Sequence, residues 1–67
     1  MGASVDLNDL VDAPEIARRF GVQRQSVVYD WRRRHPEFPE PVYVTNRIRL
    51  WLWPEVARWG QSTGRLP

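Results

Sequence analysis

The chain has 67 residues, a formal net charge of +2 and no cysteine. A chain this short buries only about 60% of the surface that its unfolded form exposes, so we expect a single small domain. With no cysteine and one histidine, neither a disulfide nor a metal or cofactor site is expected. The core must therefore come from aliphatic and aromatic side chains, among them four tryptophans.

Two further function classes are excluded by what the sequence lacks. No nucleophile and base are arranged for catalysis, and there is no glycine-rich phosphate loop, so we do not expect an enzyme. The longest apolar run, residues 50 to 53, is far below the roughly 20 residues of a membrane-spanning helix, and no signal segment opens the chain. We expect a cytoplasmic protein with no membrane partner.

Charge is segregated along the chain. Residues 1 to 17 carry a charge of −4, residues 18 to 34 carry +5, residues 35 to 46 carry −2, and residues 47 to 67 carry +3. This segregation predicts an acidic end and a basic face. All ten basic residues are arginine, which suits bidentate contacts to phosphate and guanine, although a biased genome explains the missing lysine equally well.

A first helix is expected over residues 13 to 20. Asp12, followed by Pro14 and Glu15, is typical of a helix N-terminus. Its inward stripe consists of Ile16, Ala17 and Phe20.

A second helix is expected to follow after a tight turn. Gly21 should end the first helix, and Val22 should fill the corner of the turn. The second helix then runs to about Arg34, with either Val27 or Val28 in the core beside a tryptophan. Two short helices joined by a glycine turn form a helix-turn-helix pattern.

A stiff loop and a hairpin come next. Three prolines in residues 35 to 41 force extended geometry, and Phe38 is expected to anchor this loop to the core. Strands are expected over residues 42 to 44 and 47 to 51, with Asn46 holding left-handed geometry in the turn between them.

A last helix is expected to begin at Pro54 and to end at Gly60, with Val56 and Trp59 on its apolar stripe. We place the domain at residues 10 to 60, between a flexible acidic N-terminus (residues 1 to 9) and a flexible tail (residues 61 to 67).

This order of elements resembles the winged-helix proteins of the MerR-like superfamily, and within it the phage excisionases (recombination directionality factors) and the small AlpA-type regulators. The resemblance rests mainly on "WRRRHPEFPEPV" (residues 31 to 42) and "WLWPEVARW" (residues 51 to 59). It implies an α+β, mostly α fold: a winged helix-turn-helix whose wing is a two-stranded β-hairpin.

The resemblance also implies a function. The second helix would enter the major groove of double-stranded DNA, and the wing would contact the adjacent minor groove or backbone. Excisionases bind repeated sites cooperatively and bend DNA so that an integrase or other recombinase can bridge distant arms, and an AlpA-type transcriptional regulator is the alternative. Nothing resembles an effector domain, so no small-molecule ligand is expected.

The outward face of the second helix depends on its register. At about 100° per residue, a core Val27 leaves Gln25, Ser26, Tyr29, Arg32 and Arg33 on the opposite face, and a core Val28 leaves Ser26, Tyr29, Asp30 and Arg33. Such side chains suit base edges, phosphates and sugars. For Tyr29 the alternative to contacting DNA is a place at the rim of the core.

Basic residues at three further places are candidate DNA contacts. Arg32, Arg33 and Arg34 end the second helix, where cations favour the helix dipole and the DNA backbone, although a solvated helix end carries the same residues. In the hairpin, Asn46, Arg47 and Arg49 suit a narrow minor groove, although they also fit the outer face of an ordinary strand. Arg18 and Arg19 of the first helix are expected to contact phosphate or solvent.

Two expectations concern protein partners. The acidic residues 6 to 15 are expected to meet the basic end of a neighbouring copy, head to tail on DNA. The competing interpretation is a protein-interaction module that uses this segment and an exposed Trp53.

Overall fold

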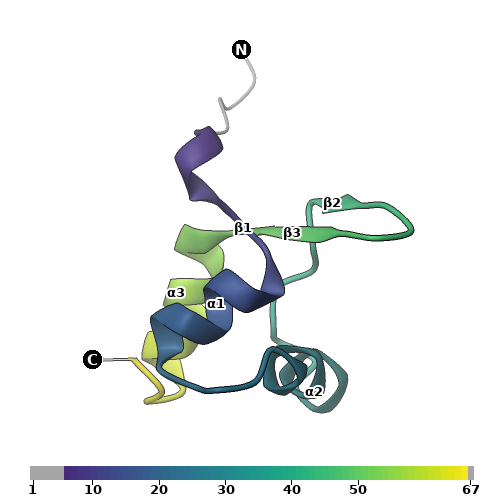
Figure 1. Ribbon diagram of the computed structural model, residues 1–67. Helices are drawn as coiled ribbons and strands as arrows, with labels where there is room; N and C mark the ends of the chain where they lie inside the picture. The colour runs from purple at the N-terminus through teal and green to yellow at the C-terminus, as the bar shows by residue number, and fades with distance from the viewer. Residues whose placement is uncertain (1–5, 67) are drawn as a thin grey trace.

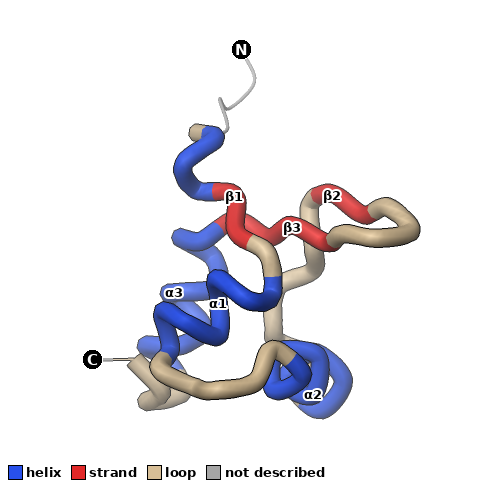
Figure 2. Tube along the Cα trace, in the orientation of Figure 1, coloured by secondary structure: helices blue, strands red, loops and turns tan. Residues whose placement is uncertain are grey.

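The computed structural model describes residues 6–66, and in these the chain folds into helices packed on one side of a small antiparallel sheet (Figures 1 and 2). The α+β class is confirmed, and the arrangement is compatible with a winged helix. In chain order the elements are η1 (Leu7–Asp9), β1 (Leu10–Val11), α1 (Ala13–Phe20), α2 (Ser26–Arg34), β2 (Tyr43–Val44), β3 (Arg49–Leu52) and α3 (Trp53–Ser62).

The sheet has one strand more than the sequence predicts. Its order is β1-β3-β2, with Val11 of β1 opposite Trp51 of β3, and Tyr43 of β2 opposite Leu50 of β3. Strand β1 has two residues, too few for any alternation of apolar and polar residues to be visible. It pairs residues 10 and 11, which precede the Asp12 cap of α1, with the edge of β3 that β2 does not occupy.

Helix α1 forms as predicted and has a defined signal at each end. The Asp12 carboxylate accepts a hydrogen bond from the Glu15 N–H at 2.9 Å, which caps the N-terminus. At the C-terminus Gly21 takes φ +76°, and the Val22 N–H donates to the Ala17 carbonyl at 3.0 Å. The turn therefore directs the chain into α2 at a fixed angle.

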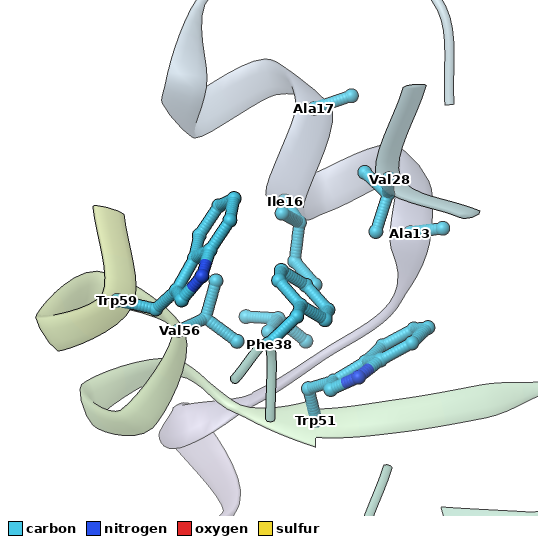
Figure 3. Packing of buried hydrophobic residues seen from close by; sticks show 9 residues of the cluster. Ala13, Ile16, Ala17, Val28, Phe38, Trp51, Val56 and Trp59 are labelled. Carbon is cyan, nitrogen blue, oxygen red and sulfur yellow. The ribbon is translucent and has the colours of Figure 1, made fainter. Parts of the chain in front are cut away.

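The core settles the register of α2. Val28 is fully buried, whereas Val27 is only partly so. Val28 packs with Ile16, Trp51 and Val56, which are also fully buried (Figure 3). The face opposite Val28 is therefore the one that points away from the core.

The proline loop is anchored to the core as expected. Phe38 is buried, its ring 4.8 Å from that of Trp59 and edge-on to it. The Trp51 indole N–H donates to the Pro39 carbonyl at 3.0 Å. Two aromatic anchors thus fix the loop that leads from α2 into the hairpin.

The hairpin differs from the prediction at its tip. Its second strand begins at Arg49 instead of Arg47, and Arg47 lies in the turn. Asn46 does not take left-handed geometry, since within residues 6–66 only glycines have positive φ. Thr45 closes the turn instead, because its hydroxyl oxygen accepts the N–H groups of Arg47 and Ile48 at 3.2 and 3.0 Å.

The C-terminal helix also differs from the prediction. Gly60 is buried within α3, which continues to Ser62, and the left-handed glycine that ends it is Gly64, at φ +78°. The Arg65 N–H donates to the Gly60 carbonyl at 2.8 Å, and its guanidinium lies 4.7 Å from the Trp59 ring centre. Most of the predicted flexible tail is therefore folded back onto the core.

The predicted flexible N-terminus lies partly outside the described residues, and its residues 7–9 form η1. None of the helices in residues 6–66 has the length and apolar character needed to cross a membrane.

Candidate nucleic-acid interface

The outward face of α2 carries the polar residues that both registers predicted. Ser26 and Arg33 are exposed, and Tyr29 is 37% exposed. Gln25 is exposed and directly precedes the helix. A short helix anchored from behind by Val28 therefore presents a hydroxyl, a phenol and a guanidinium along one side.

Tyr29 joins this helix face to the hairpin. Its ring centre lies 6.3 Å from that of Trp51, roughly edge-on, and 5.9 Å from the guanidinium carbon of Arg49. Because Trp51 and Arg49 are two residues apart in β3, both point to the face of the sheet that α2 packs against. The helix and the hairpin thus form one continuous surface.

A hollow of about 330 Å³ lies between α1, α2 and the hairpin tip. Its lining residues are Asp12, Ala13, Pro14, Gln25, Tyr29, Arg47, Ile48 and Arg49. Two guanidinium groups, a phenol and an amide border it, so it can hold an anionic group such as a DNA phosphate. The negative charge of the Asp12 carboxylate, which caps α1, opposes such binding.

The three arginines at the end of α2 have different surroundings. Arg32 donates to Glu40 of the proline loop at 3.0 Å and is partly buried, so it ties the helix end to the loop. Arg33 pairs with Asp30 one turn earlier, and both side chains remain largely exposed. Arg34 is exposed and forms no ion pair within residues 6–66. All three arginines thus remain predicted DNA contacts, and Arg32 differs from Arg33 and Arg34 in that its ion pair also ties the helix end to the loop.

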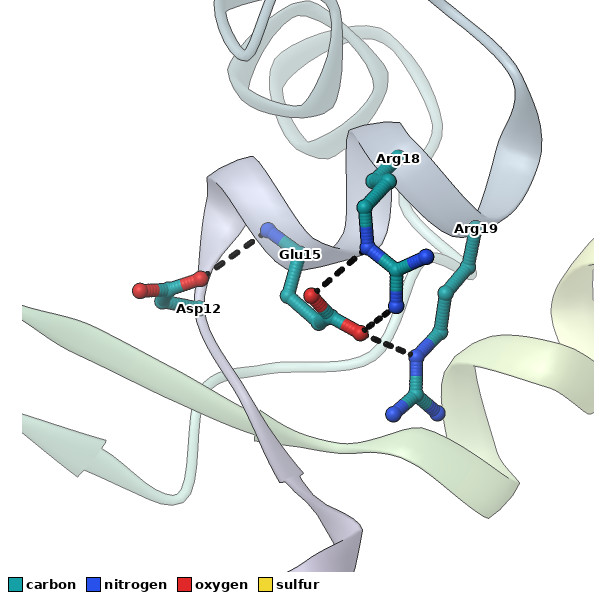
Figure 4. Close-up of polar contacts among 4 residues, drawn as sticks. All are labelled: Asp12, Glu15, Arg18 and Arg19. Carbon is teal, nitrogen blue, oxygen red and sulfur yellow. Dashed lines mark hydrogen bonds and ion pairs between the residues drawn. The ribbon is translucent and has the colours of Figure 1, made fainter.

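Arg18 and Arg19 are held by a carboxylate on their own helix (Figure 4). Glu15 accepts hydrogen bonds from both guanidinium groups, and these contacts, with that of Arg18 first, lower the pKa of Glu15 to about 2. The Arg19 guanidinium also lies 4.8 Å from the ring centre of Trp53, on the side of α1 that faces α3. Arg19 therefore lies against the start of α3, while Arg18 borders a hollow beside Gln25.

Two residues at this surface were not among the predicted contacts. Arg24 is exposed just before α2 and has no ion pair in the described part of the chain. Arg24 lies in the basic segment, two residues before Ser26, and on that ground it could have been predicted as a DNA contact. Thr45 positions Arg47, because its hydroxyl oxygen accepts the Arg47 N–H in the turn. A threonine two residues before Arg47 is only a weak indication of such a turn in the sequence.

Comparison of the chain with protein-family models, with curated proteins and with solved structures finds no match.

Proposed function

We propose that this protein binds double-stranded DNA, with α2 in the major groove and the β2–β3 hairpin on the neighbouring backbone or minor groove. The observation that carries the proposal is the contact of Arg49 with Tyr29, which joins the hairpin to the outward face of α2. A helix about 10 to 12 Å across fits the roughly 12 Å major groove. The hairpin beside it then lies over the adjoining strand.

Charge at this surface supports the same function. Arg47 and Arg49 form no ion pair within residues 6–66, and Arg33 has only an exposed pair with Asp30. Exposed ion pairs contribute only about 0 to 1 kcal/mol, so Arg33 can exchange Asp30 for a phosphate or a guanine at little cost. Phosphates release counterions when arginines neutralise them, and this supplies most of the affinity that does not depend on sequence.

Within DNA binding we propose an excisionase-like role in the cytoplasm of a host cell, with an integrase or other recombinase as the protein partner. This narrower proposal rests on the sequence resemblance. An AlpA-type transcriptional regulator is the alternative that the same residues favour.

The protein-interaction interpretation has less support. Trp53, which was to serve as the exposed anchor, is partly buried against Phe20, with ring centres 5.9 Å apart, and lies under the guanidinium of Arg19. Of the acidic residues between positions 6 and 15, Asp12 and Glu15 are already engaged.

Footprinting on the DNA that surrounds the gene tests the proposal and separates its two versions. Protection beside an integrase attachment site supports excision, and protection over a promoter supports regulation. The absence of protection on this DNA, together with the absence of any preferred duplex in selection from a random pool, would contradict sequence-specific binding.

A further inference from the structure

The segment that follows α3 is docked on two tryptophan rings through the side chain of Arg65. The guanidinium carbon lies 4.7 Å from the ring centre of Trp59 and 5.4 Å from that of Trp31. The backbone is held as well, because the N–H groups of Arg65 and Leu66 donate to the Gly60 carbonyl at 2.8 and 3.1 Å. The segment is thereby attached to both α2 and α3, which carry the two tryptophans.

The polar partner of this guanidinium is a histidine. Nη2 of Arg65 lies 3.3 Å from Nε2 of His35, the residue that ends α2, and no carboxylate within residues 6–66 pairs with Arg65. A guanidinium offers only N–H groups, so Nε2 has to supply the accepting lone pair. The ring proton then lies on Nδ1, which is 3.8 Å from Oε2 of Glu37. The docked arrangement therefore needs a neutral His35 in one particular tautomer.

Protonation of His35 removes this contact. An imidazolium donates from both nitrogens and accepts at neither, so its Nε2–H would face the N–H groups of Arg65. Two positive groups would then stand 3.3 Å apart, and like charges at such a distance repel. Water can receive the released guanidinium, because the His35 side chain beside it is 33% exposed.

Two other features favour the proton on this ring. The carboxylate of Glu37, whose side chain is 60% exposed, can accept a hydrogen bond from the Nδ1–H of a charged His35. The carbonyl end of α2 also favours a cation at this position. A proton on His35 therefore has an alternative partner, and the contact that is lost is the one with the guanidinium.

The remaining charged groups near His35 have no described contact with its ring. On α3 the ring of Trp59 meets it, with 5.6 Å between centres. Glu55 and Arg58 of the same helix border a hollow beside Trp59. On α2 the preceding residue, Arg34, is exposed. The docked guanidinium is thus the cation that a proton on His35 would displace.

We propose that Arg65 is a pH-sensitive latch, which is closed on Trp31 and Trp59 while His35 is neutral and opens when His35 takes up a proton. In the open state His35 pairs with Glu37, and the guanidinium leaves the tryptophan rings for water. Histidine is the side chain whose charge ordinarily changes between about pH 5 and pH 8, so this is the range in which the latch is tested. The latch does not depend on DNA binding.

Proton NMR of the free protein reports the state of the latch. Two indole rings shield the side-chain protons of a docked Arg65, so their resonances should lie at higher field than those of the exposed Arg24. From about pH 8 to about pH 5 this shielding should be lost in step with the titration of the His35 ring protons. The resonances of the buried Ile16 should not move, which separates opening of the latch from unfolding. Shielding that persists once His35 is fully charged would overturn the proposal.

The matched variant at the histidine is His35→Gln. Its amide can accept a hydrogen bond as the neutral imidazole does, but it does not titrate. Any shielding of Arg65 in this variant should therefore be the same at both ends of the pH range. Loss of shielding on acidification, as in the original chain, would show that His35 does not control the latch.

Reciprocal coupling gives a second test through the histidine itself. If a proton on His35 displaces Arg65, a docked Arg65 must oppose that proton to the same extent. The titration midpoint of the His35 ring should therefore move to higher pH in Arg65→Gln. It should move to lower pH in Glu37→Gln, which removes the partner of the charged ring. An unchanged midpoint in Arg65→Gln would overturn the proposal.

Discussion

The guanidinium carbon of Arg49 on β3 lies 5.9 Å from the ring centre of Tyr29 on α2. This cation–π geometry joins the hairpin to the helix across a gap of 19 residues between the two positions. Tyr29 is itself held from behind by Trp51. The position of the hairpin relative to α2 is therefore held by core packing, and under the proposed function a duplex that contacts one element would lie against the other.

Arg33→Ala is expected to weaken specific DNA binding by about 1 to 3 kcal/mol if Arg33 contacts a base. If Arg33 contacts a phosphate, the loss should be smaller and the same for all DNA sequences. Titration of a preferred and a scrambled duplex separates the two cases. Arg32→Ala is the matched control, because Arg32 is bound to Glu40 in the loop. A folded Arg33→Ala protein with an unchanged isotherm would remove α2 as the recognition element.

Asp30→Asn is expected to raise affinity for DNA. Asp30 is the only described partner of Arg33, and its carboxylate adds a negative charge to the surface that meets phosphates. The substitution frees Arg33 and removes this repulsion, so the dissociation constant at low salt should fall severalfold. Weaker binding by a folded Asp30→Asn protein would show that the ion pair orders Arg33 for its contact.

Gly60→Ala is expected to destabilise the fold although alanine favours helices. A β-carbon at Gly60 would lie 2.7 Å from the ring of Phe20 and 2.8 Å from Leu66. The Phe20 ring cannot retreat easily, since it packs 4.9 Å from the ring of Trp31. Overpacking costs about 1 to 3 kcal/mol, and the gain in helix propensity offsets up to about 1 kcal/mol of it. Urea unfolding would measure the difference, with the exposed Gln61→Ala as control, and greater stability of Gly60→Ala would contradict this packing.

Acid should destabilise the protein partly through Glu15. Its pKa in the folded chain is about 2, below the ordinary value of 4.5, because Arg18 and then Arg19 donate to the carboxylate. Its contribution to the free energy of unfolding is therefore complete above about pH 4.5 and is lost as the pH falls towards about 2. Thermal unfolding measured over this pH range should show that Glu15→Gln loses less stability on acidification than the original chain does. The control is Glu55→Gln, which removes a carboxylate with no described ion pair and should lose as much stability in acid as the original chain. Identical pH profiles of stability for all three proteins would exclude this role of Glu15.

The sequence predicted those parts of the fold that have local signals. Asp12 and Gly21 bound α1 because capping and left-handed geometry depend on single residue types. Phe38 could be placed in the core because a proline-rich loop needs an apolar anchor. Local periodicity left the choice between Val27 and Val28 open, and only the packing of Val28 between α1, β3 and α3 decided it.

The errors arose where distant contacts override local preference. Gly60 was taken as a helix end because glycine is poor in helices, but the Phe20 ring leaves no room for a side chain there. Strand β1 exists because β3 offers it a partner far along the chain: Val11 pairs with Trp51, 40 residues later. Within the candidate site, the ion pair of Arg32 with Glu40 could not be read from the sequence, because the two residues lie on different elements and spacing alone does not bring them together.

The most direct test of the central claim is the salt dependence of affinity for a duplex, measured for the original chain and for Arg47→Ala/Arg49→Ala. Five arginines of the surface are candidates for phosphate contact: Arg24, Arg33, Arg34, Arg47 and Arg49. At about 0.9 per phosphate, log K should fall against log salt with a slope of up to about −4.5, and the folded double variant should be shallower by up to about two units. A slope near zero for the original chain, or one that the double variant leaves unchanged, would contradict a DNA surface built from α2 and the hairpin together.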